Sequence, residues 1–449
     1  MRALLISTYE MGRQPFGLAS AAAWLRAEGL DVTCVDAARE KLTDAACDAT
    51  DLVGLHLPMH TATRLAAPVI AKVRRLNPSA RICAFGLYAP LNAEWLRSLG
   101  VDEVLGGEFE KDLARWAGPP KRETDEGGRG AGSLPRIHFL VPDRAGFPPL
   151  SRYATLQMPS GERRLVGYTE ASRGCRHLCR HCPVVPVYNG QFRPVQREIV
   201  LADVAAQVAA GARHITFGDP DFFNGPTHAM RIVEALHDAH PEVTYDATIK
   251  VEHLLQHRHL LPRLAATGCV FIVSAVESLD DEVLALLDKG HTREDFFTAV
   301  ALCRSAGVTL TPTFVAFHPW LTLKSYCDLL ETIARLDLVD HVAPIQLAIR
   351  LLVPEGSRLL ELNQMRAHIT RFDPATLTYR WVHPDPRVDA LHHAVTALVG
   401  TRLTTDRCAL FAEISALAHR RAGLPPLPSD TRPARARATV PYLDEPWYC

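Results

Sequence analysis

The chain has 449 residues, enough for two or three domains, and 47% of them are apolar, so it can fill ordinary hydrophobic cores. Its 49 Lys and Arg residues nearly balance its 50 Asp and Glu residues, and the formal charge of -1 excludes a global basic field that would attract nucleic acid or anionic lipid. No apolar run approaches the ~20 residues that span a bilayer, and the opening MRALLIS is typical of a buried strand rather than a signal peptide. We therefore expect a cytoplasmic protein without a membrane or nucleic-acid partner.

The first predicted domain covers residues 1–118, where short apolar runs alternate with amphipathic stretches. This alternation predicts a doubly wound, Rossmann-like α/β domain with a mostly parallel sheet. The stretch 119–135 is charged, rich in Gly and Pro and without hydrophobic period, which predicts a linker. The predicted strands of this domain are 2–7, 31–36, 52–57, 81–86 and 102–107, with helices near 18–28 and 63–76.

A second series of strands and helices occupies residues 136–355. Its spacing predicts a partial (βα)6 barrel, whose chemistry should lie at the carboxyl ends of the strands. Residues 356–423 are predicted to be helical, and the Pro-rich stretch 424–449 predicts an extended tail. The six predicted barrel strands are 165–171, 214–218, 243–249, 270–275, 308–315 and 342–349.

Three cysteines, Cys175, Cys179 and Cys182, form a Cys-x3-Cys-x2-Cys array directly after the first predicted barrel strand. Eleven cysteines in the whole chain are too few for a disulfide scaffold, so clustered thiols indicate metal binding. Three thiolates leave one iron of a [4Fe-4S] cluster open to an exogenous ligand. A structural zinc site would take a fourth ligand, and His177 or His181 is available for that alternative.

This array after a barrel strand resembles the signature of the radical S-adenosylmethionine (SAM) superfamily, over about residues 160–350. The resemblance implies that Cys175, Cys179 and Cys182 hold a [4Fe-4S] cluster whose open iron chelates SAM. It also implies reductive cleavage of a carbon–sulfur bond of SAM, with electrons from a donor such as a flavodoxin or ferredoxin. The residue before the third cysteine is usually aromatic in the superfamily and packs near the cofactor, which gives His181 that role.

The resemblance also implies a SAM-binding turn after the second strand, where Gly218 and Asp219 stand in place of a Gly-Gly-Glu-Pro-like sequence. Asp219 is the first choice to receive the SAM ammonium, because a carboxylate pairs with a cationic amine, and Asp221 is the second. The alternative for both is a cap on the following helix. Glu277, after the fourth strand, matches the position that contacts the SAM ribose.

Two basic residues, Lys250 after the third strand and Arg350 after the sixth, are predicted to hold the SAM carboxylate or an acidic substrate. The alternative for each is an exposed charge or a salt bridge. The sequence Gly106-Gly107-Glu108 also resembles the superfamily turn, but it precedes the cluster loop and is not assigned to SAM.

The first domain resembles the cobalamin-binding domains of one large branch of the superfamily, which implies cobalamin as a further cofactor. The Asp-x-His-x-x-Gly loop whose His would ligate cobalt is missing after the first strand, where STYEMGRQPFG stands. Residues 86–88 and 106–107 are available to line a nucleotide tail, whereas His56 and His60 match no ligand position. The alternative is a degenerate domain that only packs on the barrel.

The ending Pro446-Trp447-Tyr448-Cys449 resembles the tails of radical SAM proteins named for Cys-Cys-Ala-Glu-Pro or Cys-Sec-Ala-Glu-Pro. Because this chain stops at the first Cys, we expect that a selenocysteine UGA codon has been read as a stop. The resemblance implies arsinothricin-type biosynthesis, in which the 3-amino-3-carboxypropyl group of SAM is moved to trivalent arsenic. Cys449 would then be a catalytic ligand of the thiophilic substrate arsenite.

The sequence thus predicts a radical SAM enzyme, with aminocarboxypropyl transfer to arsenite as the leading interpretation. The alternative is a 5′-deoxyadenosyl-radical enzyme that acts on an organic substrate, including cobalamin-dependent methyl transfer. A third interpretation, an iron–sulfur or zinc protein that only relays electrons, is disfavoured by the open coordination site and by the acid after the second strand.

Overall fold

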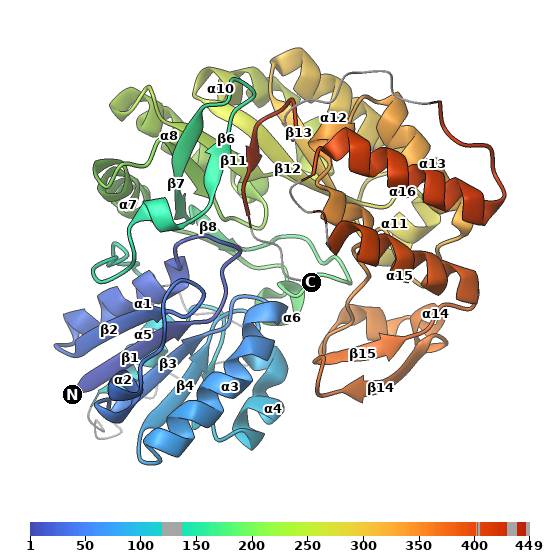
Figure 1. Cartoon of the computed structure of the whole chain (residues 1–449). Coiled ribbons are helices and arrows are strands. Elements are labelled where there is room, and N and C mark those ends of the chain that lie inside the picture. Colours follow the sequence, from blue (N-terminus) through green and yellow to red (C-terminus); the bar gives the residue numbers. More distant parts are fainter. Residues whose placement is uncertain (119–136, 401, 403–404, 429–437, 446–449) are drawn as a thin grey trace.

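The computed structural model describes residues 1–118, 137–400, 402, 405–428 and 438–445, and the predicted linker at 119–135 lies outside them. Figure 1 shows an N-terminal α/β domain, drawn in blue, lying below a larger curled sheet drawn in green to yellow, with two C-terminal helices in red at one side. Within the described residues, no helix combines the length and apolar character needed to cross a membrane.

The N-terminal domain is built on a parallel sheet in the order β2-β1-β3-β4-β5. Helices α1 and α5 pack on one face of the sheet, while α2 and α3 cover the other, so the predicted doubly wound domain is confirmed. The elements are β1 (Arg2–Ser7), α1 (Phe16–Ala27), β2 (Asp31–Asp36), α2 (Asp44–Asp48), β3 (Leu52–His56), α3 (His60–Leu76), β4 (Arg81–Phe85), α4 (Ala93–Ser98), β5 (Glu103–Leu105) and α5 (Glu110–Ala117).

The second sheet has the order β13-β12-β11-β10-β7-β6-β16. Five strands are parallel, and β6 and β16 extend the β7 edge in antiparallel fashion. The strands are β6 (Thr155–Gln157), β7 (Arg163–Thr169), β10 (His214–Phe217), β11 (Thr244–Thr248), β12 (Cys269–Glu277), β13 (Thr309–Phe314) and β16 (Tyr442–Leu443). The helices around them are α7 (Arg197–Ala209), α8 (Pro226–Ala239), α9 (Val251–Gln256), α10 (Leu261–Ala266), α11 (Asp281–Leu287), α12 (Arg293–Ala306) and α13 (Leu323–Arg335).

The barrel helices begin and end where their sequences supply caps. Thr292 and Asp295 form a capping box at the start of α12, in which each side chain accepts a backbone N–H of the other residue. Gly307 ends the helix in the left-handed region, at φ 74°, where a residue without Cβ is unstrained. Such local signals explain why the helix positions were predictable from sequence.

The predicted sixth barrel strand at 342–349 is wrong. The chain forms the 3-10 turn η6 (Pro344–Leu347) there, directly after η5 (Val339–His341), because Pro344 lacks an N–H for a ladder and favours the first turn of a helix. Only an isolated parallel bridge between Phe317 and Arg350 remains of a sixth strand. The curled sheet is therefore a half-barrel with five parallel strands.

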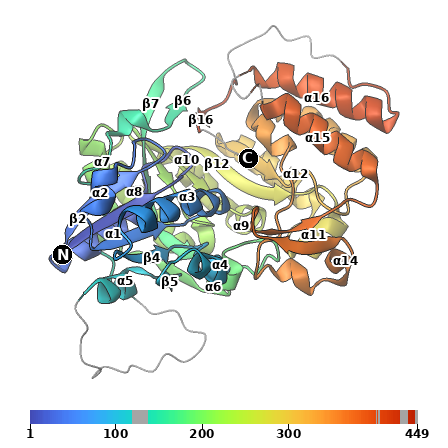
Figure 2. The same cartoon turned by 60° about the horizontal axis from the view of Figure 1, so that its bottom comes forward.

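The region predicted to be helical at 356–423 is only partly so. A hairpin of β14 (Ile369–Asp373) and β15 (Thr378–Trp381) follows the short α14 (Asn363–Arg366), and it is seen beside α11 in Figure 2. Helices α15 (Pro386–Gly400) and α16 (Arg407–Ala422) come next, and α16 packs against α13. The predicted tail supplies β16, which joins the barrel sheet by pairing with β6.

Candidate active site

The cluster loop, residues 172–182, leaves the carboxyl end of β7 through the short strand β8 (Ser172–Gly174), which pairs with β9 (Phe192–Pro194). Gly174 has φ 73°, and a Cβ on it would lie 2.3 Å from the carbonyl oxygen of Gln191, so this turn requires glycine. The turn places Cys175 directly after the strand. The Cys182 N–H then donates to the Cys179 carbonyl oxygen at 3.1 Å, which folds the second half of the loop back on itself.

The three thiols face a common, largely buried region. Burial and the nearby thiolates of Cys179 and Cys175 raise the pKa of Cys182 to about 12. Burial would lower the pKa of Lys289, but Glu277 and the Cys179 and Cys182 thiolates raise it, so a buried ammonium accompanies the cysteines. Three neighbouring cysteines with one adjacent cation suit an anionic iron–sulfur cluster, whose binding requires the thiols to lose their protons.

Neither histidine of the loop is placed as a simple fourth ligand beside these thiols. His181 Nε2 lies 3.1 Å from Glu277 Oε1, and the two nitrogens of His177 face Lys250 and Asp221. The donor set therefore fits a cluster held by three cysteines with one open position, which is the arrangement that the sequence predicted.

Glu277, at the end of β12, joins the cysteine region to the sheet. Burial would raise its pKa, but Lys289 and His181 hold the pKa of Glu277 at about 2, so it stays ionised. Its backbone lies in the left-handed region, at φ 67°, a conformation that is strained for a residue with a side chain. The structure thus brings Glu277 to the cluster loop, where it contacts the sequence-predicted His181.

Asp219, the first choice for the SAM ammonium, is 2% exposed and already has two partners. Its Oδ2 accepts the Ala171 N–H at 2.9 Å and its Oδ1 accepts the Ser172 hydroxyl. Burial outweighs these hydrogen bonds and raises the pKa of Asp219 to about 7. Asp219 therefore fastens the start of the cluster loop to the turn after β10.

Asp221 and Gly218 flank the same turn. Asp221 caps η3 (Phe222–Asn224) through its Oδ1, which accepts the Phe223 N–H at 3.2 Å, while its Oδ2 faces His253 Nδ1 at 2.6 Å. A Cβ at Gly218 would lie 1.8 Å from the Tyr168 hydroxyl oxygen, so only glycine permits this approach of the turn to β7. The sequence analysis offered a helix cap as the alternative role of Asp221, and its Oδ1 atom has that role at η3.

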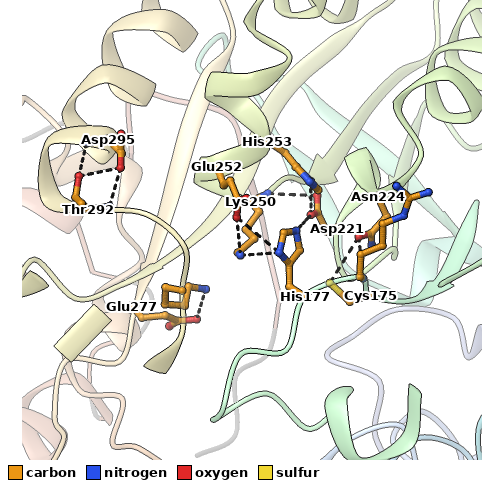
Figure 3. A network of polar contacts seen from close by, with 12 residues as sticks. Cys175, His177, Asp221, Asn224, Lys250, Glu252, His253, Glu277, Thr292 and Asp295 are labelled. Carbon is orange, nitrogen blue, oxygen red and sulfur yellow. Dashed lines mark hydrogen bonds and ion pairs between the residues drawn. The ribbon is translucent and has the colours of Figure 1, made fainter. Parts of the chain in front are cut away.

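The two predicted basic residues lie in different surroundings. Lys250 Nζ is 2.9 Å from His177 Nδ1 and 3.1 Å from Glu252 Oε2, so it belongs to the cluster-loop network drawn in Figure 3. Arg350 instead donates to Asp389 Oδ1 at 2.7 Å and stacks over Trp381. The structure does not bring Arg350 to the cluster loop, and the predicted catalytic Cys449 lies outside the described residues.

A cavity of about 210 Å³ separates the carboxyl edges of the two sheets. Its walls come from the loops after β1, β3, β4 and β5 and from the ends of β7 and β10, so both domains contribute. Ligands of open α/β sheets bind outside the carboxyl ends of the strands, where the strand order reverses. Among its lining residues are Glu10, Arg13, His56, Gly86, Leu87, Gly107, Tyr168, Glu170, Arg173 and Gly218.

The sequence analysis considered His56 but assigned it no role, and it did not consider Glu10; both line this cavity. His56 Nδ1 lies 2.7 Å from Glu10 Oε1, and the ring covers Gly17, where a Cβ would lie 2.2 Å from Nε2. His56 is the last residue of the buried parallel strand β3, and Glu10 lies in the loop after β1. The carboxyl-edge rule, when applied to the first sheet as well as to the barrel, would have found them.

A buried charge cluster joins the first domain to the cluster loop. The Arg173 guanidinium lies 2.6 Å from Glu110 Oε1, 2.7 Å from Glu170 Oε2 and 3.8 Å from Glu108 Oε2. Glu108 also accepts the Tyr188 hydroxyl at 3.2 Å, and burial raises its pKa to about 7 although Arg173 opposes the shift. Glu108, the acid of the Gly-Gly-Glu sequence left unassigned to SAM, thus serves the interface between the domains.

Residues 169–333 match the family model of the Radical SAM superfamily. This segment runs from the end of β7 through the cluster loop and α12 and into α13, so it contains the cysteines and the polar network described above. The segment 169–333 is therefore a radical SAM domain, as the cysteine array after the first barrel strand predicted.

Two curated relatives illustrate the sequence similarity. The chain is 28% identical over 193 residues to the tRNA-2-methylthio-N(6)-dimethylallyladenosine synthase of Chlorobium phaeobacteroides (strain BS1). The aligned region covers 40% of this chain and 42% of that protein. It is 27% identical over 133 residues to the bacteriochlorophyllide d C-12(1)-methyltransferase of Chlorobaculum tepidum (strain ATCC 49652 / DSM 12025 / NBRC 103806 / TLS), covering 29% and 28%. The chain thus matches less than half the length of these relatives.

Solved structures resemble almost the whole chain. OxsB, a cobalamin-dependent SAM radical enzyme with aqua-cobalamin and SAM bound, gives a TM-score of 0.69 at 16% identity, over 90% of this chain and 67% of that chain. TsrM from Kitasatospora setae, a radical SAM methyltransferase with tryptophan and the SAM analogue aza-SAM bound, gives 0.64 at 16% identity, over 88% of each chain. The α/β class, with an N-terminal domain ahead of a partial barrel, is confirmed.

Proposed function

We propose that this protein is a cobalamin-dependent radical SAM enzyme that transfers a methyl or related alkyl group to a small organic molecule. The observation that carries the proposal is the cavity between the carboxyl edges of the two sheets, with the three cysteines on the barrel side. The named structures OxsB and TsrM, whose folds this chain shares, are described as cobalamin-dependent or cobalamin-bound and support the same function.

The residues around the cavity fit a cobalamin in two respects. Gly86 has φ 110° and Gly107 has φ 62°, so the backbone comes to the cavity wall without side chains at both positions. Arg13 Nε is buried and has no hydrogen-bond partner, which leaves a donor for an amide or phosphate oxygen of a bound cofactor. Residues 86–87 and Gly107 belong to the segments that the sequence analysis suggested for a nucleotide tail.

The chain's own residues would then have distinct tasks. When bound, the cluster supplies an electron for SAM cleavage and cobalamin carries an alkyl group between donor and acceptor. Cys175, Cys179 and Cys182 hold the cluster, and Lys289 offsets its negative charge. Asp219 holds the loop start, and the cavity walls exclude water from the reacting groups. The electron donor we propose is a flavodoxin or ferredoxin in the cytoplasm.

An anaerobic reconstitution tests this function. The full chain is loaded with iron, sulfide and hydroxocobalamin, desalted, and scored for bound cobalamin by its visible absorbance. We expect one cobalamin per chain, and loss of cobalamin but not iron in Leu87→Trp, which fills the cavity. Val382→Trp, on a side chain that is 61% exposed, is the matched control. Equal cobalamin loading of both variants would contradict the proposal.

A second candidate function, transfer of the SAM aminocarboxypropyl group to arsenite, is favoured by one observation on the tail. After β16, Glu445 forms an ion pair with Arg13, which lines the cavity, and Glu445 has a buried side chain. The C-terminal segment is thus held next to the proposed site, and Cys449 follows four residues later in the sequence. This supports the role in arsenic chemistry that the tail resemblance implies for Cys449.

The nucleoside product separates the two candidates. With SAM and a strong reductant, methylthioadenosine together with an arsenic-containing amino acid formed only when arsenite is present would establish aminocarboxypropyl transfer. 5′-Deoxyadenosine or a methylated product that is indifferent to arsenite would favour the alkyl transferase. Replacing Cys449 by Ser should depress only the arsenite-dependent product.

A further inference from the structure

Beside the cluster loop, three potential ligand atoms converge on one point (Figure 3). They are His177 Nε2, Asp221 Oδ2 and His253 Nδ1, and all lie within 4.8 Å of one another. Asp221 is 2% exposed and His253 is 8% exposed, so both side chains are taken out of solvent by the fold. None of the three belongs to the Cys-x3-Cys-x2-Cys ligand set.

The orientation of these atoms differs from that of an ordinary hydrogen-bonded cluster. His253 Nδ1 is 2.6 Å from Asp221 Oδ2 and His177 Nε2 is 3.6 Å from it, yet each of the three atoms is buried without a hydrogen-bond partner. Atoms this close that do not point at one another are arranged as ligands around a cation are. Ligands at ~2.0–2.1 Å from a tetrahedral zinc ion lie roughly 3.3 Å apart, a value between these two distances.

The surrounding groups also suit a metal site. Asp221 Oδ1 is engaged by the Phe223 N–H, which fixes the carboxylate and leaves Oδ2 for a ligand. Lys250 Nζ lies 2.9 Å and Glu252 Oε2 lies 3.6 Å from His177 Nδ1, so metal binding through Nε2 requires Lys250 to turn away and the Nδ1 proton to meet the Glu252 carboxylate. Lys250, which contacts both His177 and Glu252, can then remain paired with the Glu252 carboxylate.

We propose that His177, Asp221 and His253 bind one divalent transition-metal ion of the zinc type, in addition to the cluster. Two imidazoles and one carboxylate are the donors that such ions take in three-ligand sites, whereas calcium and magnesium prefer oxygen donors throughout. The ion fastens the segment between Cys175 and Cys179, through His177, to the turn after β10 and to α9. The site depends on these side chains alone, so it is independent of the proposed cobalamin chemistry.

Zinc binding to the cluster-loaded protein tests the site. The full chain is reconstituted anaerobically with iron and sulfide, incubated with zinc, desalted and analysed for both metals by mass spectrometry. We expect about one zinc per chain in the unmodified protein, and at least a tenfold loss of zinc affinity with unchanged iron in Asp221→Asn and His253→Ala. His257→Ala is the matched control, because the His257 ring lies beside that of His253, with centroids 5.8 Å apart, but is not a ligand.

X-ray absorption at the zinc edge separates this site from zinc in the cysteine loop. Nitrogen and oxygen neighbours at ~2.0–2.1 Å are expected, and a chain with Cys175, Cys179 and Cys182 all replaced by Ala should lose iron and keep zinc. Sulfur neighbours at ~2.3 Å, or equal zinc in the unmodified chain, Asp221→Asn and His253→Ala, would overturn the proposal. Circular dichroism of each variant shows whether zinc loss reflects a lost ligand or a lost fold, and His177→Ala gives a third, independent test of the ligand set.

Discussion

The two carboxyl edges that face each other across the cavity are built on opposite principles. The barrel edge is crowded with paired charges, such as Glu277 with Lys289 and Lys250 with Glu252, and each pair is fixed by the strand or loop that carries it. The edge of the N-terminal sheet offers Gly86 and Gly107, where the backbone itself forms the wall. The comparison teaches that the barrel edge holds its charged groups in several fixed pairs, whereas on the N-terminal edge bare backbone lies beside a single such pair, Glu10 with His56.

The strongest test of the barrel edge is removal of the thiols. Replacing Cys175, Cys179 or Cys182 by Ala should remove the open-iron cluster and abolish SAM cleavage, a loss of at least about a thousandfold, because the electron source is gone. The measurement is nucleoside formation together with iron content. Cys303→Ala, a buried cysteine on α12 outside the loop, should retain both. Substantial turnover in any loop variant would refute the cluster assignment.

The next largest effect is expected from Lys289→Met. This change leaves the buried Glu277 carboxylate without its ammonium partner, and breaking a buried pair costs about 3–5 kcal/mol of unfolding free energy. Urea unfolding of the protein before cluster loading measures it. Combining Lys289→Met with Glu277→Gln should recover much of the loss, and a double variant as unstable as the single one would show that the charge pair is not the cause.

Gly218→Ala tests how closely the two strands of the site approach. The added methyl group would meet the Tyr168 hydroxyl, and we expect a loss of about 1–3 kcal/mol from overpacking. Pairing it with Tyr168→Ala should remove the clash, although the cavity left by the ring has its own cost. The Tm values of the single and double variants test this explanation. An unchanged Tm in Gly218→Ala would mean that the turn can shift to accept the methyl group.

The smallest expected effect is a change in the pH dependence of stability, caused by Glu108 at the interface between the two domains. Burial raises the pKa of Glu108 to about 7, above its ordinary value near 4.5, so the native state holds the proton more tightly than the unfolded chain. The stability contributed by this group is full below about pH 4.5 and is lost as the pH rises through 7. Glu108→Gln should therefore lose less Tm between pH 5 and pH 8 than the unmodified protein, by a few degrees. Glu94→Gln, an exposed position in the same domain, should behave as the unmodified protein does.

Much of the fold was predictable because its signals are local. Buried parallel strands such as β1 and β3 appear as nearly continuous apolar runs, and the helices begin at caps such as Thr292. The run at 342–349 failed because a buried 3-10 turn is as apolar as a strand, and Pro344 was the available warning. The hairpin at 369–381 was missed because its strands are short and largely polar.

The cysteine loop was predictable for the same reason, since its ligands lie within eight residues of sequence. The grouping of His177, Asp221 and His253 was not, because it depends on three carboxyl-edge loops that only the curled sheet brings together. Asp219 shows the converse limit. Its position in the sequence matched a SAM-binding turn, yet which oxygen meets which N–H is decided by the packing of β7 against β10.

The ion pair between Arg13 and Glu445 joins residues that are 432 positions apart. During synthesis the first domain leaves the ribosome long before its partner in this contact exists. Only when β16 has paired with β6 can the chain bring Glu445 to the first domain. Synthesis as far as Glu445 is thus a step in assembling the cavity, and a ribosome that stopped before Tyr442 would release a chain whose domains still meet through Arg173 and Glu110 but lack the ion pair at Arg13.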